Sequence, residues 1–512
     1  MIENASDTEV LIAGAGPTGL VLALWLTRLG VKVRIVDKAA EAGATSRALA
    51  VQARTLEFYS QLGIAEAVVE AGHKVGAMRL WVGGKPVTQV ELHEIGEGVS
   101  PFDYMFIFPQ DEHERLLLAE LARLKVQVER STELTGFTDD GDCVRAVLRL
   151  PDGTEEMCEA AYLVGCDGAH STVRHVLGAG FPGGAYEQLF YVADVEGSGE
   201  PVDGNLNIDL DESDFLAVFP LKAPGHVRLI GVVRGERAAR AESLTFEDVS
   251  SQAIEDLKIK VGKVNWFSTY HVHHRVADRF RKGRAFLAGD AAHIHSPAGG
   301  QGMNTGIGDA VNLAWKLAAV AQRRAPAGLL DSYEPERIGF ARRLVATTDR
   351  AFTLASSTGG LARRIRTQLA PRLLPSLTGL DFVRRFAFRT VSQTVVNYRH
   401  GPLARGAAGA VWGGDRLPWV RRADGGDNFT ALKSLDWQVH VYGEPSTELH
   451  WLCQAAKLDL IRFEWSPGMR QAGVKKDALY LVRPDGYVAL ADPKGDAERL
   501  LVYLDAHGIT PL

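Results

Sequence analysis

The segment 284–304 combines residue types that could bind a flat, polar cofactor. Its apolar run, residues 285–288, is long enough for one buried strand, and Gly289 and Asp290 end that run. A loop of small residues and proline follows, and a helical pattern begins near Gln301. The carboxylate can accept hydrogen bonds from a ribose or ribityl hydroxyl, and the glycines let a ring lie close to the backbone. The helix start offers free N–H groups and a partial positive charge, so the segment predicts one half of a cofactor site.

The other half is predicted at the start of the chain, where segment 9–37 follows a strand–turn–helix–strand pattern with a dinucleotide fingerprint. Gly14 allows the tight turn, Gly16 lets a pyrophosphate approach the backbone, and Gly19 lets the helix pack on the strand. Asp37 ends the second strand and suits an unphosphorylated ribose, so FAD or NAD fits better than NADP. A glycine turn in an ordinary α/β protein is the alternative, but the two flanking strands and the acid make it the weaker one.

Three further positions could reach a cofactor, and each also has an ordinary structural explanation. Arg47 lies just before an amphipathic helix, where it could contact phosphates or simply be a solvated helix cap; we favour the phosphates. Gln110 stands at a strand-to-helix junction and could bond a cofactor edge, with the alternative equally open. Asp167 and Gly168 form a second strand–acid–glycine–helix junction, where the acid could be a plain N-cap.

Composition excludes several classes of function. The chain has 512 residues, 46% of them hydrophobic and 23% charged, which is typical of a globular protein with a large core. The net charge of -6 gives no indication of nucleic acid as a partner. The 4 cysteines form no CxxC pair or metal knuckle, so we expect neither disulfides nor zinc. The polar N-terminus shows no signal peptide and no apolar run could span a bilayer, so we expect a cytoplasmic protein without membrane contact.

A group of histidines could suggest a metal site. His271, His273 and His274 are close in sequence, and His293 and His295 follow. No carboxylate or cysteine completes a ligand spacing, and His271 and His273 fit one face of a strand. We therefore expect no metal.

The order of the predicted elements indicates an α/β fold with a Rossmann-like nucleotide domain and an inserted, mostly antiparallel sheet that would form one wall of a substrate pocket. Residues 401–427 are rich in glycine, proline and charge, and we interpret them as a linker. We divide the chain into residues 1–180 (first part of the nucleotide domain, with 75–110 contributing to the sheet), 181–275 (substrate sheet), 276–400 (second part and a helical segment) and 401–512 (a small α/β unit).

Together these motifs resemble one enzyme family. The stretches 14–19, 166–174 and 289–304, in this order and spacing, are similar to the class A FAD-dependent aromatic hydroxylases, which include the para-hydroxybenzoate and phenol hydroxylases. The closest resemblance is to the branch that acts on polyketide and other polyphenolic substrates. It is strong over residues 8–345. Residues 401–512 resemble, more weakly, the thioredoxin-like domain of that branch, but without a CxxC a redox role for them is unsupported.

The resemblance implies roles for particular residues. The ADP part of FAD would be held at the first turn, the ribityl or pyrophosphate region at Asp290, and the isoalloxazine along the glycine loop. The cofactor-binding residues implied are Gly14, Gly16, Pro17, Thr18, Gly19, Asp37, Lys38, Arg47, Gln110, Asp167, Gly168, Gly289, Asp290, Pro297, Gly300, Gln301, Gly302, Met303 and Asn304, with Pro297, Gly299 and Gly300 beside the isoalloxazine.

The chemistry implied by the family is hydroxylation of an aromatic substrate with O2, through a flavin C4a-hydroperoxide. The chain has only one dinucleotide fingerprint, so NADPH (or NADH) would have no Rossmann domain of its own and would meet a flavin that swings outward. A positively polarised helix start near Gln301 would stabilise the negative charge of reduced flavin.

Other functions of the same fold remain open. These are an FAD-linked dehydrogenase or reductase, a Baeyer–Villiger or epoxidising variant, a flavin-dependent halogenase, for which the chain lacks a WxWxIP-type motif, and a non-catalytic flavin-binding module. Product mass separates the enzymes. No catalytic base can be named from the sequence, a homodimer is possible, and strand parity offers four pocket candidates: Tyr104, Tyr191, His226 and Arg275.

Overall fold

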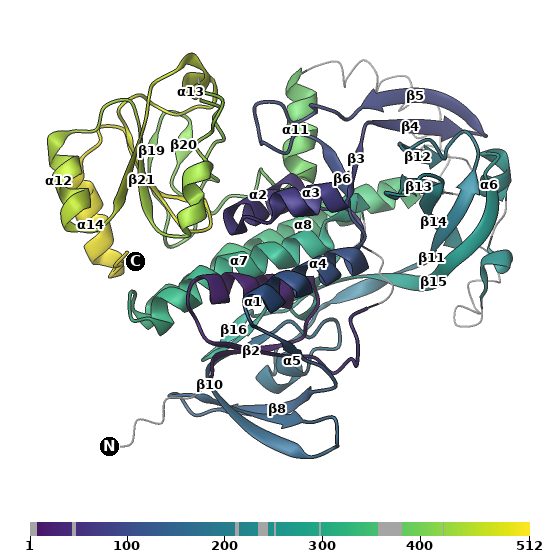
Figure 1. The fold of residues 1–512 in the computed structure, drawn as a ribbon, viewed down its shortest axis with the longest axis horizontal. Helices are drawn as coiled ribbons and strands as arrows, with labels where there is room; N and C mark the ends of the chain where they lie inside the picture. Colours follow the sequence, from purple (N-terminus) through teal and green to yellow (C-terminus); the bar gives the residue numbers. More distant parts are fainter. Residues whose placement is uncertain are drawn as a thin grey trace.

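The computed structural model describes residues 8–43, 48–209, 215–233, 244–249, 252–295, 298–356, 381–422 and 424–511. Figure 1 shows the C-terminal unit at one side, a central layer of helices and one large sheet (β11, β14, β15) at the other side, with another large sheet (β2, β8, β10) below the helices. None of the described helices is long and apolar enough to cross a membrane.

The first sheet has eight strands and a parallel centre, as the βαβ pattern at the N-terminus predicts. β1 lies between β2 and β10, and β17 pairs with the other edge of β10, all in parallel. The carboxyl ends of β1, β10 and β17 therefore meet at one edge, where the three motifs lie. The strands are β1 (Thr8–Ala13), β2 (Val33–Val36), β7 (Val128–Glu129), β8 (Glu133–Asp139), β9 (Val144–Arg149), β10 (Glu155–Gly165), β16 (Arg281–Lys282) and β17 (Ala285–Leu287).

The second sheet combines strands from distant parts of the chain and is mostly antiparallel. Its order is β18-β15-β11-β14-β13-β12-β4-β5, with only the β12–β4 pair parallel. Its strands are β4 (Ala77–Val82), β5 (Lys85–Glu91), β11 (Gly183–Ser198), β12 (Leu206–Asp209), β13 (Leu216–Pro220), β14 (His226–Val233), β15 (Lys260–Val276) and β18 (His293–Ile294). Because β15 also pairs with β18, which lies within the third motif, the second sheet is anchored beside the candidate site.

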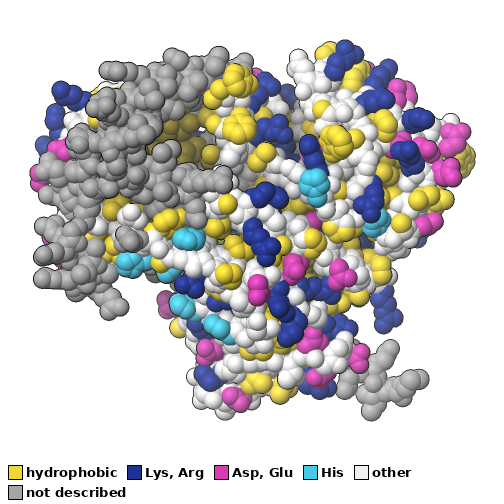
Figure 2. All heavy atoms as spheres, turned by 180° about the vertical axis from the view of Figure 1, so that it is seen from behind, with side chains coloured by type: hydrophobic (Ala, Val, Ile, Leu, Met, Phe, Trp, Pro, Cys, Tyr) yellow, Lys and Arg dark blue, Asp and Glu magenta, His cyan; other side chains and the backbone are white. Residues whose placement is uncertain are grey.

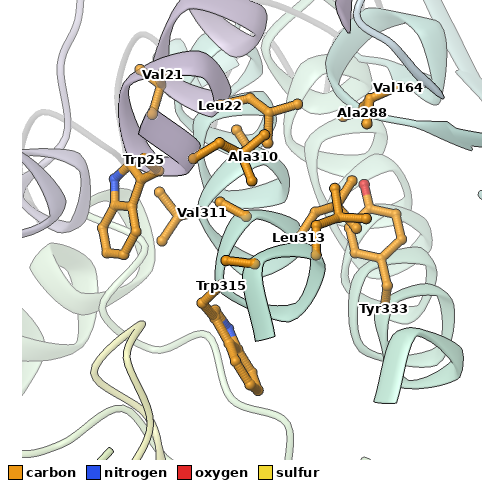
Figure 3. Packing of buried hydrophobic residues seen from close by; sticks show 14 of the residues in the cluster. Val21, Leu22, Trp25, Val164, Ala288, Ala310, Val311, Leu313, Trp315 and Tyr333 are labelled. Atoms are coloured by element: carbon orange, nitrogen blue, oxygen red, sulfur yellow. The ribbon is translucent and has the colours of Figure 1, made fainter. Parts of the chain in front are cut away.

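Helix α7 (Gly302–Ala321) runs through the centre of the molecule (Figure 1). Figure 3 shows α1 (Pro17–Arg28) packed against it, with Leu22 and Trp25 facing Ala310 and Val311. Tyr333, fully buried at the start of α8 (Tyr333–Ser356), donates to the carbonyl of Leu287 at 2.7 Å and so ties α8 to the first sheet. The other α-helices that the structure describes before the C-terminal unit are α2 (Ala53–Leu62), α3 (Ala65–Ala71), α4 (Gln110–Arg123), α5 (Thr172–Leu177), α6 (Gln252–Asp256) and α11 (Asp381–Val391). A small two-stranded ribbon pairs β3 (His73–Val75) with β6 (Met105–Ile107).

The C-terminal unit is a six-stranded mixed sheet with three helices. Its strands are β19 (Arg405–Ala408), β20 (Val411–Trp412), β21 (Gln438–Tyr442), β22 (Asp459–Phe463), β23 (Leu479–Val482) and β24 (Val488–Asp492), and its helices are α12 (Thr447–Ala455), α13 (Pro467–Gln471) and α14 (Ala497–His507).

The expectation that residues 401–427 form a linker is wrong. β19 pairs in parallel with β24, and β20 pairs with β19, so this segment is part of the C-terminal sheet. Leu417 and Arg416 are buried, and Arg416 donates to the Glu57 carboxylate of α2. A charged residue in a glycine-rich stretch resembles a solvated loop in sequence, because its partner lies 359 positions away.

The contact between the C-terminal unit and α2 depends on a buried carboxylate. Glu57 accepts hydrogen bonds from Arg416 at 2.8 Å, from Arg54 at 2.8 Å and from Ser100 at 2.6 Å, and its side chain is 1% exposed. Burial would raise the pKa of Glu57, but Arg416 and Arg54 outweigh burial and lower it. The carboxylate is therefore ionised and joins two guanidinium groups.

We predict that Glu57→Gln destabilises the protein by about 3 kcal/mol, since it leaves two buried guanidinium groups without their counter-charge. Urea unfolding measures this. Glu133→Gln, which removes an exposed ion pair with Arg149, should change stability by less than about 1 kcal/mol. Equal effects of the two substitutions would contradict the prediction.

Candidate active site

The three glycines of the turn after β1 are of two kinds, according to what a Cβ atom added at each would meet. Gly14 has φ 102°, and a Cβ there would overlap the carbonyl oxygen of Cys166. A Cβ on Gly19 would overlap the carbonyl oxygen of Gly14. Gly16 differs, since a Cβ there would meet no atom within 4 Å. Two glycines are therefore needed for internal packing, whereas Gly16 faces open space suited to a ligand.

Asp37 is held in place by the backbone of the same turn. Its Oδ2 accepts from the N–H of Ala15 at 2.7 Å and its Oδ1 from Ala39 at 2.8 Å. Each carboxylate oxygen has two acceptor lone pairs, so one bond on each leaves capacity for a ribose hydroxyl. Lys38, the next residue, is exposed.

Gln110 lies in the first turn of α4, beside Glu114. Its amide donates to Glu114 at 2.7 Å, and its side chain is half-buried. Burial raises the pKa of Glu114, and the charges of Asp37 and Asp111 add to the rise, although Gln110 opposes it. Glu114 thus connects Gln110, its hydrogen-bond donor, with Asp37, whose charge acts on it.

The junction after β10 uses its acid partly as a cap. Asp167 Oδ2 accepts from the N–H of Val173 at 3.1 Å, while Ser171 caps α5 through the N–H of Arg174 at 2.9 Å. Gly168 has φ 76° and open space beside it. Oδ1 of Asp167 is buried and accepts from no described residue, which fits a donor supplied by a bound molecule.

The turn after β17, helix α1 and helix α7 meet at the side chain of Thr18 in α1. A Cβ on Gly289, which has φ 63°, or on Gly306 would crowd the hydroxyl of Thr18. Pro17 stands at the first position of α1, where its missing N–H costs nothing. The first and third motifs are therefore in direct contact, as the sequence predicts for two halves of one site.

Asp290 is the acid of this turn, and its surroundings are unusual. Its side chain is exposed to solvent, yet protein surrounds it closely enough that burial raises its pKa. The charge of Asp309 adds to the rise, and His293 opposes it. A carboxylate that is both accessible and enclosed fits a cleft in which a ligand hydroxyl could donate to it.

Asp309, which the sequence analysis missed, fixes the position of this turn. Its Oδ2 accepts from the N–H of Gly289 at 3.0 Å and lies 2.6 Å from Nε2 of His293. Its Oδ1 accepts from Arg337 at 2.6 Å. Asp309 is 0% exposed, so these partners are what keeps it ionised: Arg337 and His293 lower its pKa although burial alone would raise it. The only sequence signal is an acid in an apolar helical pattern.

The glycine loop before α7 is held by amide side chains. Gly299 and Gly300 have φ 73° and 63°. Asn304 is 1% exposed; its Oδ1 accepts from the N–H of Gln52 at 2.8 Å and its Nδ2 donates to the carbonyl of Gly300 at 2.8 Å. The Gln52 side chain donates to the carbonyl of Gly299 at 2.9 Å.

Gln301 is turned inward as well. It donates to the carbonyl of Val391 at 2.8 Å and accepts from Gln393 at 2.7 Å. The side chains of Asn304 and Gln301 are thus used within the protein, and the backbone at Gly302 and Met303 is what the start of α7 can offer a ring. Gln52 and Gln393 are further residues that the sequence analysis missed.

Two predicted positions, Arg47 and Pro297, lie outside the described residues. The four pocket candidates are dispersed. Tyr191 is 2% exposed and packs on Gly231 and Phe267, in the apolar cluster that the second sheet forms with α6, on the opposite face from Arg228. It is therefore a core residue, because side chains alternate along a strand.

The other three candidates lie apart from one another. Tyr104 packs on Phe106, under Lys74, and burial raises its pKa to about 12. His226 pairs with Glu196 at the far end of β14. Arg275 pairs with Ile294 of β18, beside the third motif.

Among the described residues, no group of three or more histidine, cysteine or acidic side chains could hold a metal ion.

Comparison with known proteins decides the family. A model described as "FAD binding domain" matches residues 7–348. The chain belongs to this family. A curated relative named 6-methylpretetramide 4-monooxygenase, from Streptomyces rimosus, is 36% identical over 554 residues, covering 100% of this chain and 95% of the relative.

Solved structures agree. Anhydrotetracycline hydroxylase OxyS from Streptomyces rimosus has a TM-score of 0.78 and 31% identity, covering 98% of this chain and 99% of that one. A ternary complex of aklavinone-11 hydroxylase with FAD and aklavinone has a TM-score of 0.77 and 25% identity, covering 99% of both chains. The protein is an FAD-dependent aromatic monooxygenase, as its resemblance to the aromatic hydroxylases implied, and the α/β fold predicted from the sequence is confirmed.

The two kinds of glycine give a matched test of the FAD site. We predict that Gly16→Ala folds with wild-type stability but binds FAD at least about tenfold more weakly, because its methyl group would occupy the approach of the pyrophosphate. Gly19→Ala should instead destabilise the apoprotein, since its methyl group overlaps the protein itself. Fluorescence titration of apoprotein with FAD and thermal unfolding separate the two effects; normal FAD affinity in Gly16→Ala would refute the assignment.

Proposed function

We propose that this monooxygenase uses NADPH and O2 to hydroxylate a phenolic or polycyclic, polyketide-like substrate, with FAD bound across the three strand ends described above. The observation that carries the proposal is their convergence: the open side of Gly16, the buried Oδ1 of Asp167 and the enclosed carboxylate of Asp290 meet at one edge of the first sheet. When bound, FAD would supply the electron transfer and oxygen activation.

The chain's own part is to bind and orient. Asp37 would accept from the adenosine ribose, Gly16 would admit the pyrophosphate, and Asp290 would accept from the ribityl region. The N–H groups at the start of α7 would favour negative charge on the ring. The ring would lie along Gly299 and Gly300, where the positive φ values favour glycine, which has no side chain to cover the backbone.

One face of the second sheet supports an aromatic substrate. Ile230, Phe219 and Ile208 belong to the same apolar cluster as Ala50, and Ala50 lies against the loop at Gly300. An apolar wall beside a glycine loop suits a flat ring system. The sizes of the relatives' substrates, which their names place among the tetracycline and aklavinone compounds, favour a polycyclic substrate here as well.

The same face carries one buried ion pair. Arg228 is 1% exposed, donates to Asp194 at 2.6 Å and 2.7 Å, and lies over the ring of Trp266. Its guanidinium therefore has its counter-charge within the protein, and we expect the pair to orient the wall and not to bind a substrate anion.

The decisive experiment is anaerobic reduction of the bound flavin by NADPH, with and without a panel of phenols and polycyclic aromatics, followed by reaction with 18O-labelled O2. We expect one panel member to accelerate reduction and to gain one labelled oxygen atom. Loss of hydrogen without labelled oxygen would indicate a dehydrogenase, and a gain of oxygen with cleavage of a ring C–C bond would indicate a Baeyer–Villiger reaction.

A surface of histidines beside Arg275 supports NADPH as the electron donor. Figure 2 shows histidine side chains gathered on the back face of the molecule. Burial lowers the pKa of His273, and the neighbouring groups Arg275, His271, His274 and His170 lower it further. Neighbouring positive groups disfavour the protonated form of His273. An anion that pairs with that form, such as a nucleotide phosphate, would therefore be favoured here.

We predict that the KM for NADPH rises as the pH is raised from about 5 to about 6.5, since the pKa of His273 is lowered and its cation, which would pair with phosphate, is lost below the usual histidine pKa. His273→Gln should raise KM severalfold, equivalent to about 1 kcal/mol at a partly exposed site, and should flatten the pH dependence. His226→Gln, on the same sheet but beside Glu196, is the matched control. A KM that is independent of pH would sink the assignment.

A further inference from the structure

The C-terminal unit extends one charged side chain into the helices of the FAD domain. Arg483 follows β23 and is 1% exposed. It donates to both carboxylate oxygens of Glu336 in α8, at 2.7 Å and 3.0 Å, and also to Asp485 at 2.9 Å. A two-point contact between a guanidinium and a carboxylate fixes orientation as well as distance.

Glu336 in turn connects α8 to α7. It accepts from Lys316 at 2.8 Å and from Asn312 at 2.7 Å, and the Glu336 and Lys316 side chains are both 0% exposed. Burial alone would raise the pKa of Glu336, but Arg483 and Lys316 lower it to about 2. Burial lowers the pKa of Lys316 to about 8 even with Glu336 beside it.

The next residue of α8 reaches the flavin side. Arg337 donates to Asp309 at 2.6 Å, to the carbonyl of Thr305 at 3.0 Å and to the hydroxyl of Tyr398 at 2.9 Å. Asp309 accepts from the N–H of Gly289, the first residue of the turn that carries Asp290. Tyr398 completes the path from the C-terminal unit to this turn, because Arg483 lies over its ring at 5.3 Å and Arg337 donates to its hydroxyl. The path therefore runs from Arg483 through Tyr398, Arg337 and Asp309 to Gly289.

The charges along this path are balanced. Its cations are Lys316, Arg337 and Arg483, and its anions are Asp309, Glu336 and Asp485, so formal charges cancel three against three. Without Arg483, three buried carboxylates would share two cations. A buried carboxylate that loses its partner is costly, and Arg337, one position along α8 and joined to Arg483 through Tyr398, is the guanidinium that remains on this path.

We propose that Arg483 is a positioning residue for the flavin site: by satisfying Glu336, it leaves Arg337 free to hold Asp309 and, through it, the Gly289–Asp290 turn. The C-terminal unit, which lacks a CxxC pair, then contributes to cofactor binding by fixing a turn in another domain. The inference rests on the proposed FAD site only in assigning that turn to the cofactor.

The test compares Arg483→Met, which removes the charge at similar length, with the double variant Arg483→Met/Glu336→Gln. The double variant restores charge balance, with two cations against two anions. Arg462→Met is the control in the same unit, because the Arg462–Glu444 pair is exposed. All variants are full-length, and three quantities are measured: FAD affinity of the apoprotein, deuterium uptake of residues 285–310 in the apoprotein, and the unfolding midpoint.

We expect Arg483→Met to weaken FAD binding about tenfold, the scale of coupling within one ion network, and to speed exchange in residues 285–310. The double variant should bring FAD affinity back to within about twofold of wild type, and Arg462→Met should change neither quantity. Arg483→Met and the double variant both lose the hydrogen bonds between Arg483 and Asp485. This loss therefore lowers the stability of the two variants equally and does not affect their comparison. If Arg483→Met does not accumulate in folded form, Arg483→Lys, which keeps the charge, and the double variant give the comparison: both should bind FAD as wild type does.

Two results would overturn the inference. One is a lower unfolding midpoint in Arg483→Met with unchanged FAD affinity and unchanged exchange at residues 285–310. That result would show that Arg483 has a purely structural role. The other is a double variant that binds FAD as weakly as the single one, which would show that docking and not charge balance matters. The variant Asp290→Asn tests the proposed FAD site separately from the role of Arg483. If Asp290→Asn binds FAD normally, the assignment of the Gly289–Asp290 turn to the cofactor is wrong, whatever Arg483 does.

Discussion

Charged side chains on a buried helix must find partners inside the protein, and much of this structure follows from that constraint. Helix α7 is buried along most of its length, yet it carries Asp309 and Lys316 on one face. Neither can reach water, and an unpaired charge at such a position costs several kcal/mol. Their partners come from α8, and Glu336 of α8 in turn requires Arg483 of the C-terminal unit. The electrostatics of one helix therefore determine how three parts of the chain are held together.

The flavin site is built from backbone more than from side chains. Gly14, Gly19, Gly289 and Gly306 let α1, α7 and the turns after β1 and β17 approach so closely that a Cβ on any of the four would overlap a neighbouring atom. Asn304 and Gln301 stand where side chains could contact a ring. Their side chains instead accept hydrogen bonds from Gln52 and Gln393. A cofactor would thus meet N–H groups and carbonyls of fixed position. Such groups cost little reorganisation when charge develops on a bound ring.

The second sheet separates its two tasks by face. Its outer face buries Tyr191 and its neighbours under α6, and this provides stability. Its inner face carries Arg228 and an apolar set that continues to Ala50 at the glycine loop. One edge of the same sheet, β15, places a row of histidines beside Arg275 on the surface. Alternation along the strands lets one element serve the core, the proposed substrate wall and the proposed donor surface.

The sequence by itself determined the family, the fold class and the three strand-end motifs, since each motif is local: a strand, a glycine turn and an acid occupy consecutive positions. It could not determine which of those residues are free to bind. Asp167 and Asn304 look alike in sequence as polar residues at helix starts, but contacts 6 and 252 residues away decide what each does. The same holds for Arg416, which resembled a linker residue, and for Tyr191, which strand parity offered as a pocket residue but which lies on the core face of the sheet. Burial, face and long-range pairing depend on how distant segments pack, and only the tertiary structure contains that information.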